Sequence, residues 1–154
     1  MRAAAINSIV AIGGDRAFEI VSAALHDIDD FVRTRAAIGL ARINLTMAIS
    51  MIRSKLNKFP ELKSYLTGLL FAAGEPYNDI GEMDVLAINV VDEVCDKDKM
   101  NSIYKKSLDR EKRLHAFRVL SLNNNLESYT FMKGALRDPL PEIREEAKKA
   151  LNAH

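Results

Sequence analysis

The side chains able to do chemistry in this chain are few and lie far apart in the sequence. Its three histidines, His26, His115 and His154, have no glutamate or cysteine at the spacing of a metal site. Two carboxylate pairs, at positions 92–93 and 96–98, have the residue types for general acid–base work, but the solvated end of a helix explains them better. The sequence holds no glycine-rich phosphate loop, nucleophile elbow or metalloprotease helix. We therefore expect no enzyme, no metal and no cofactor.

The single cysteine and the composition indicate where the protein resides and what class it belongs to. Cys95 cannot form an internal disulfide, so we predict a reducing compartment and place the protein in the cytoplasm. With 154 residues, 48% of them hydrophobic and 28% charged, the chain can form one helical domain with a sizeable core. Its longest uncharged run is too short to cross a bilayer, so we expect no membrane insertion.

The chain contains a sequence motif that recurs along its length. The motif at 32–37, followed by Leu40 and Ile43, returns 31 residues earlier at the start of the chain and again near its C-terminus. The matching positions are Met1, Arg2, Ala5, Ile9 and Ile12, and then Ile143, Arg144, Ala147 and Leu151. Self-similarity of this length indicates stacked helical units, none of which can bury its apolar face alone. The sequence therefore predicts an all-α solenoid.

The clearest unit spans residues 13–44 and reads as a helical hairpin. Its first helix presents one apolar face, formed by Phe18, Val21 and Leu25. Acidic residues at 27–30 make the turn and supply N-cap carboxylates for the second helix. The apolar stripe of that second helix consists of Val32, Ala36, Leu40 and Ile43.

This unit resembles the short HEAT-like repeat of phycobilisome lyases. The resemblance rests on Gly14-Asp15, Phe18, Leu25, Asp27-x-Asp29, Val32-Arg33, Ala36 and Leu40, and the segment 138–144 matches nearly as well. It implies a right-handed α-solenoid whose second helices, the inner helices, line a concave face. It also implies a protein-binding role or a place as a module in a larger chain. We therefore expect one HEAT-like domain over residues 1–154, belonging to a longer protein.

Six inner helices are predicted to begin near positions 1, 32, 62, 83, 112 and 143. The gap between the third and fourth is only 21 residues, which leaves no room for an outer helix, and a turn-rich loop at 74–82 stands in its place. The loop either returns along the third inner helix or lets residues 83–95 pack as its antiparallel partner. Function often concentrates in such loops, which makes Tyr77 and Asp79 candidate binding residues, although decay of one repeat is an equal alternative.

Charge is unevenly distributed although the chain as a whole carries only +1. Residues 74–98 hold eight acidic residues and one lysine, a net −7, while 45–73 carry +3 and 99–122 carry +5. This pattern can steer a charged partner, or it can neutralise itself between adjacent repeats. One template position holds Arg2, Arg33, Lys63, Arg113 and Arg144, with Asp84 as its acidic member, which predicts a ladder of ion pairs along the stack.

The concave face should collect the positions three, six and ten residues after each inner-helix start. These include Arg35, Ile38, Arg42, Tyr65, Gly68, Asn89, His115 and Arg118. Tyrosine and arginine are common interface anchors, so we predict a protein–protein interaction scaffold or adaptor that binds its partner there. The predicted partner-binding residues are Arg35, Arg42, Tyr65, Tyr77, Asp79, Asn89, His115 and Arg118.

Two alternative functions follow from the same resemblance. HEAT-like DNA glycosylases hold duplex DNA in a basic concave groove, and Arg33, Arg35, Arg42 and Arg118 are the candidates for one here. The low net charge and the acidic fourth unit argue against nucleic acid, because phosphate binding needs a continuous basic stripe. A bilin lyase, or a subunit associated with one, is the other alternative.

The N-terminal helix lacks an outer partner in this scheme. Solenoids normally protect both ends with polar caps. We therefore expect either that the natural protein extends further at its N-terminus, or that a second copy covers Ile6, Ile9 and Val10.

Overall fold

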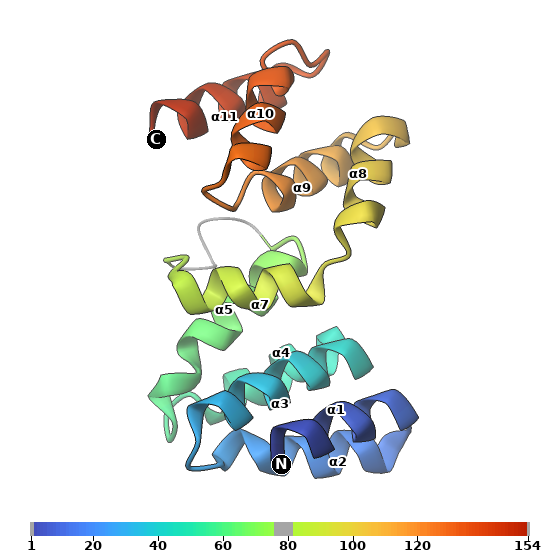
Figure 1. Ribbon diagram of the computed structural model, residues 1–154, viewed down its shortest axis with the longest axis vertical. Coiled ribbons are helices and arrows are strands. Elements are labelled where there is room, and N and C mark those ends of the chain that lie inside the picture. The colour runs from blue at the N-terminus through green and yellow to red at the C-terminus, as the bar shows by residue number, and fades with distance from the viewer. Residues whose placement is uncertain (1, 76–81, 154) are drawn as a thin grey trace. The chain divides into compact units, whose positions relative to one another are not determined.

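The computed structural model describes residues 2–75 and 82–153, and these residues are helices joined by turns (Figure 1). They contain ten α-helices, two short 3-10 helices and no β-strand. The prediction of an all-α chain is thereby confirmed. The chain divides into two compact units, Met1–Val94 and Cys95–His154, each with its own core.

The first unit contains six α-helices in the part of it that the structure describes. They are α1 (Arg2–Ile12), α2 (Asp15–Ala23), α3 (Asp30–Ile43), α4 (Leu45–Lys55), α5 (Lys63–Ala72) and α7 (Val85–Val94), with 3-10 turns at Ala24–His26 and Pro60–Leu62. The second unit contains α8 (Lys97–Lys106), α9 (Arg110–Leu120), α10 (Leu126–Ala135) and α11 (Pro141–Asn152). The six predicted inner helices are α1, α3, α5, α7, α9 and α11, each beginning within two residues of the predicted position.

Short polar residues begin most of these helices. The carboxylate of Asp29 accepts a hydrogen bond from the backbone N–H of Phe31 at the start of α3. Asp96 and Asp109 cap α8 and α9 in the same way. Such caps satisfy backbone donors that have no partner inside the helix. The turn at 27–30 therefore does supply the predicted N-cap.

Helices α1 and α3 pack closely because α3 carries a glycine at the contact. A Cβ atom at Gly39 would lie 2.7 Å from a methyl group of Val10 and 3.5 Å from one of Ile6. Ile6 is only 5% exposed, because α3 of the same chain covers it. Ile6 therefore needs no second copy of the chain as a cover, which was one of the two alternatives that we expected for this helix.

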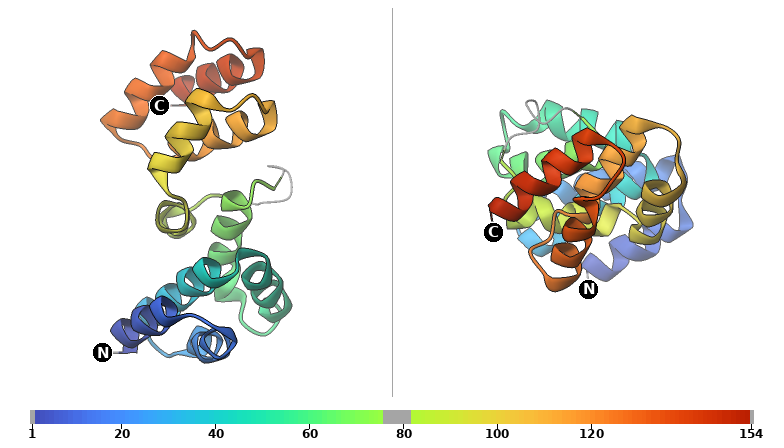
Figure 2. Two further views of the ribbon diagram at one scale, coloured as in Figure 1. Left: turned by 90° about the vertical axis from the view of Figure 1, so that its right-hand side faces the viewer. Right: turned by 90° about the horizontal axis from the view of Figure 1, so that it is seen from above.

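Helix α7 packs across α5 and against α3. The left view of Figure 2 shows α7 end-on beside the length of α5, so the two helices cross and are not antiparallel. A Cβ atom at Gly68 of α5 would lie 2.7 Å from the carbonyl oxygen of Ala87 and 2.9 Å from the Cβ of Val90. The glycine is what lets the two backbones approach this closely. Of the loop predicted at 74–82, residues 76–81 lie outside the described residues.

The second unit is built around an aromatic cluster. Phe117, Met132 and Ile143 are at most 1% exposed and form its centre. The rings of Tyr104 and Phe131 meet edge to face with their centroids 5.0 Å apart, and Phe131 lies 5.7 Å from Phe117. Aromatic pairs in such geometries contribute about 0.5–1.5 kcal/mol beyond the area they bury.

An aspartate in the turn before an inner helix binds two arginines, and this arrangement occurs once in each unit. In the first unit, the Nε of Arg2 donates to the Oδ2 of Asp27 at 2.8 Å, and Arg33 donates to the backbone carbonyl of Asp27 at 2.8 Å. In the second, Arg113 donates to Asp138 and Arg144 donates to its carbonyl, both at 2.7 Å. The sequence separations, 25 and 6 residues, are the same in both.

These contacts correct the predicted ladder. We expected Lys63 and Arg113 to flank Asp84, but Arg113 binds the turn aspartate Asp138, as Arg2 binds Asp27. Asp84 instead accepts hydrogen bonds from the hydroxyl of Ser64 and, at 2.8 Å, from the backbone N–H of Ala87. The physical reason is position: a turn aspartate lies next to the arginine of the preceding inner helix, while Asp84 caps its own helix.

Candidate protein-binding surfaces

Two of the predicted binding residues, Arg35 and Arg42 of α3, meet at Glu93 of α7 in the first unit. The Nη2 of Arg35 lies 2.5 Å from the Oε2 of Glu93. Arg42 donates to the backbone carbonyl of Glu93 at 3.0 Å and lies 3.5 Å from its Oε2. Asn89, one helical turn before Glu93, is exposed. Glu93 offsets the charge of both arginines.

Tyr65 does not lie on an exposed face. Its side chain is 2% exposed, and its hydroxyl lies 3.0 Å from the Oγ1 of Thr34 and 3.4 Å from the carbonyl oxygen of Asp30. Ile38 is equally buried at 2%. We expected both to face a concave surface, and this was wrong. Tyr65 is enclosed because α5 packs against α3, where Thr34 and Asp30 meet its hydroxyl.

The predicted residues of the second unit lie on α9. His115 is half-buried there. Arg118 binds the carboxylate of Glu146 on α11 with both ends of its guanidinium group, at 3.0 Å from Nε and 2.5 Å from Nη2. A bidentate pair of this kind is geometrically specific, so Arg118 links α9 to α11 in addition to any surface role.

The remaining predicted residues, Tyr77 and Asp79, lie outside the described residues. The acidic segment around them is partly used within the fold. Hydrogen bonds from Ser64 and from the backbone of Ala87 hold the pKa of Asp84 below its usual value. Its negative charge is thus stabilised by its own neighbours, and Glu93 is bound by arginine.

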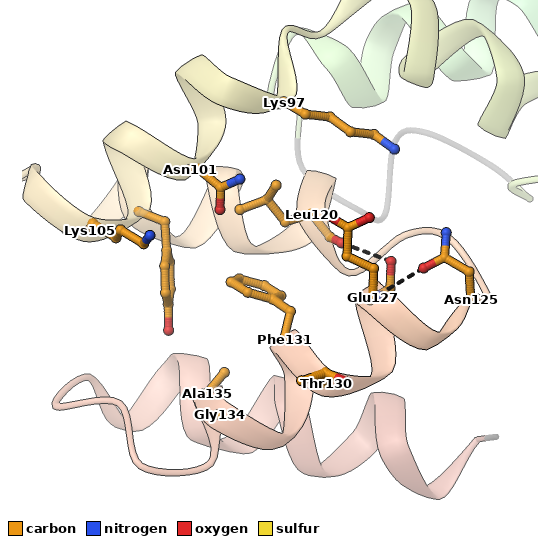
Figure 3. Close-up of a pocket in the computed structure, with 12 residues that line it drawn as sticks. Lys97, Asn101, Lys105, Leu120, Asn125, Glu127, Thr130, Phe131, Gly134 and Ala135 are labelled. Atoms are coloured by element: carbon orange, nitrogen blue, oxygen red, sulfur yellow. Dashed lines mark hydrogen bonds between the residues drawn. The ribbon is translucent and has the colours of Figure 1, made fainter.

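A groove of about 440 Å³ lies between α8 and α10 in the second unit (Figure 3). Its residues come from α8, from the end of α9 and from α10. They are Lys97, Asn101, Tyr104, Lys105, Leu120, Asn125, Glu127, Ser128, Thr130, Phe131, Gly134 and Ala135. Figure 3 shows the side chains of Leu120 and Phe131 pointing into the space between the two helices, with Lys97 and Lys105 along the α8 edge. An apolar floor with a polar rim is the usual form of a binding groove.

Polar contacts hold the α10 side of this groove in place. The side chain of Asn125 caps α10 by accepting a hydrogen bond from the backbone N–H of Ser128 at 2.8 Å. The hydroxyl of Ser128 donates to the carbonyl oxygen of Leu120 at 3.2 Å. The second bond connects α10 to the end of α9 and so fixes one wall of the groove.

A second groove, of about 360 Å³, lies between α2 and α4 in the first unit. It occupies the corresponding place in the repeat, over the end of α3. Phe18, Ile43 and Met47 supply its apolar surface, while Asp15 and Glu19 make its rim acidic. The two grooves therefore share a position and differ in charge.

Neither groove was predicted from the sequence, because the predicted binding residues lie on the inner helices and in the loop at 74–82. The helices that form their walls were predicted as outer helices, with no role assigned. One signal was available: Gly134 interrupts the apolar pattern of α10, and an isolated glycine in a helix calls for a packing or functional reason.

Within the described residues, no helix combines the length and the hydrophobicity needed to cross a bilayer. The same residues contain no group of three or more His, Cys, Asp or Glu side chains arranged to hold a metal ion. A comparison with models of known protein families found no match, and a search of curated proteins found no relative.

Proposed function

We propose that this chain is a protein-binding module built as a right-handed α-solenoid of HEAT-like hairpins. Support for the repeat comes from the six inner helices at their predicted positions and from the aspartate–arginine arrangement, which occurs in both units at the same sequence separations. The lone thiol of Cys95 fits a reducing compartment, so we place the module in the cytoplasm, as an adaptor and not as an enzyme.

The observation that carries the binding function is the open groove between α8 and α10. Its floor exposes apolar surface from Leu120 and Phe131, which the fold could otherwise have buried. Surfaces of this kind, rimmed by polar residues, mark interaction sites. The concave face is the weaker candidate, because Tyr65 is buried and Arg35 is bound to Glu93.

The nucleic-acid alternative gains no support from the arginines proposed for it. Arg33 donates to backbone carbonyls at the turn before α3, and Arg35 and Arg42 bind Glu93. Arg118 binds Glu146. A phosphate backbone would have to displace each of these acceptors. The bilin lyase alternative rests on the family resemblance, and no observation favours it.

Site-specific photo-cross-linking in cells that naturally make the protein tests this proposal. A photoreactive p-benzoylphenylalanine replaces Thr130 at the groove in one strain and Lys149 on α11 in a control strain. We expect a protein adduct, identified by mass spectrometry, from position 130 alone. Adducts with nucleic acid, or the same proteins from both positions, would contradict a protein-binding groove.

A further inference from the structure

Among the described residues, three glycines lie inside α-helices, and helix packing explains two of them. Gly39 lies where α3 meets α1, and Gly68 lies where α5 crosses α7. At both positions a Cβ atom would come within 2.7 Å of an atom of the neighbouring helix. In this protein a helical glycine thus marks a close crossing with a second helix.

Gly134 in α10 has no such neighbour. A Cβ atom there would meet nothing within 4 Å. The residue is not a helix cap either, because positive φ among the described residues is confined to Gly13, Gly14 and Gly74. Glycine destabilises a helix relative to alanine, so the isolated fold gains nothing from it. The open space beside Gly134 is the groove between α8 and α10.

We propose that a helix of a partner protein docks in this groove and crosses α10 at Gly134. This inference rests on the proposed protein-binding function and names the partner's chemistry: an amphipathic helix with an apolar face and an acidic flank. The apolar face contacts Leu120 and Phe131 on the groove floor. The absence of a side chain at Gly134 lets the two backbones approach, as Gly39 and Gly68 do inside the fold.

The charge of the groove determines which residues the flank of the partner helix should carry. Lys97, Asn101 and Lys105 follow one another at four-residue spacing and line the α8 edge. Lys105 is exposed in the last turn of α8. Glu127 is the one acidic residue among the described lining residues, and it lies in the first turn of α10, where the helix dipole stabilises a negative charge. A partner helix therefore needs an acidic residue that faces Lys105.

A phage-displayed library of helical peptides tests the inference directly. Each peptide carries an apolar face at positions i, i+3, i+4 and i+7, with the flanking positions randomised, and is selected on the full chain. We expect binders enriched in Asp and Glu on one flank. Binders with basic or neutral flanks, or no binders, would overturn the proposed partner chemistry.

Variants of the groove then locate the site for the selected peptides. Gly134→Leu should weaken binding by about 30-fold, because the new side chain fills the crossing point, as expected for a hot-spot position. Lys105→Glu should weaken it by about tenfold, mainly through slower association at low salt. Glu145→Leu and Lys149→Glu on α11 add the same side chains elsewhere on exposed helix and should leave binding unchanged.

The outcomes separate this inference from the function on which it rests. If the peptides bind Gly134→Leu as well as the wild type, the crossing at Gly134 is wrong. If the library yields nothing while cross-linking at Thr130 still captures a protein, the module binds proteins but not an acidic helix. If neither experiment finds a protein ligand, both proposals fail.

Discussion

At the scale of single residues, Asp138 is a buried carboxylate that depends on its hydrogen-bond partners. Its side chain is only 3% exposed, and it accepts hydrogen bonds from the hydroxyl of Tyr104 at 2.6 Å and from Arg113 at 2.7 Å. Burial acts to raise the pKa of Asp138, but the bonds from Arg113, from Tyr104 and from the backbone of Leu140 outweigh it, so the pKa lies below its usual 3.8. Burial and the adjacent carboxylate raise the pKa of Tyr104.

Asp138→Asn should therefore destabilise the second unit at neutral pH. The expected loss is about 3–5 kcal/mol, because the substitution leaves Arg113, whose side chain is only 16% exposed, without its charged partner. Urea denaturation followed by circular dichroism measures it. Lys148 and Glu145 form an exposed pair on α11, so Glu145→Gln, the matched control, should cost no more than about 1 kcal/mol.

The same substitution should change how stability depends on pH. Because the folded pKa of Asp138 is depressed, its contribution is complete above 3.8, the unfolded value, and is lost as pH falls through the folded pKa. The gap between wild type and Asp138→Asn should therefore close progressively below about pH 5. A gap that stays constant down to about pH 2 would show that the carboxylate charge is not what stabilises the site.

Tyr65 illustrates how burial changes the expected effect of a substitution. If Tyr65 were on the surface, Tyr65→Ala would weaken partner binding and change the free energy of unfolding little. With 2% of its area exposed and its hydroxyl bonded to Thr34, Tyr65→Ala should cost about 3–5 kcal/mol of stability, whereas Tyr65→Phe should cost about 1 kcal/mol. Thermal melts of both variants check this. An alanine variant as stable as the wild type would mean that Tyr65 is exposed in solution.

At the scale of helices, glycine decides where two elements approach and where space is left open. Gly68 and Gly134 form a natural comparison, since both lie in helices and only the first faces a neighbour. Alanine at Gly68 must push against the backbone oxygen of Ala87, which does not move as easily as the end of a flexible side chain.

We expect alanine substitutions at these two glycines to change the stability of the protein in opposite directions. Gly68→Ala should destabilise the protein by about 1–3 kcal/mol through overpacking, despite the better helix propensity of alanine. Gly134→Ala should stabilise it by about 0.5–1 kcal/mol, because nothing lies within reach of the added methyl group. Chemical denaturation of both variants settles the comparison. Destabilisation by Gly134→Ala would indicate that the free fold needs this glycine.

At the scale of the whole molecule, the chain consists of two units with separate cores. Val21 in the first and Ile143 in the second are both fully buried, so they are equivalent places to weaken each core. Because most contacts lie within one unit or the other, damage to one core should remain near its site.

Hydrogen exchange can show whether the two units open independently. Val21→Ala should lower amide protection in α1–α3, and Ile143→Ala should lower it in α9–α11, with little effect on the other unit in each case. Mass spectrometry of the exchanging amides gives the map. Uniform loss of protection along the chain from either variant would mean that the molecule unfolds as a single cooperative domain.

The sequence by itself determined the helices and much of their apolar faces. Helix formation depends on contacts three and four residues apart and on local caps, so periodicity and turn residues were enough to place the six inner helices. The buried stripe of Val32, Ala36 and Leu40 follows from the same periodicity, as does the cap at Asp29.

Only the tertiary structure decided which helix faces pack against other helices and which remain exposed. The crossing of α7 over α5 depends on contacts between Gly68, Ala87 and Val90, which are far apart in sequence and carry no periodic signal. Tyr65 is buried with its hydroxyl against α3, and Glu93 of α7 binds Arg35 and Arg42, whereas the sequence predicted an open concave surface for all three of these predicted binding residues. The groove between α8 and α10 likewise arises where two helices stand apart over the end of a third, an arrangement set by packing and not by local propensity.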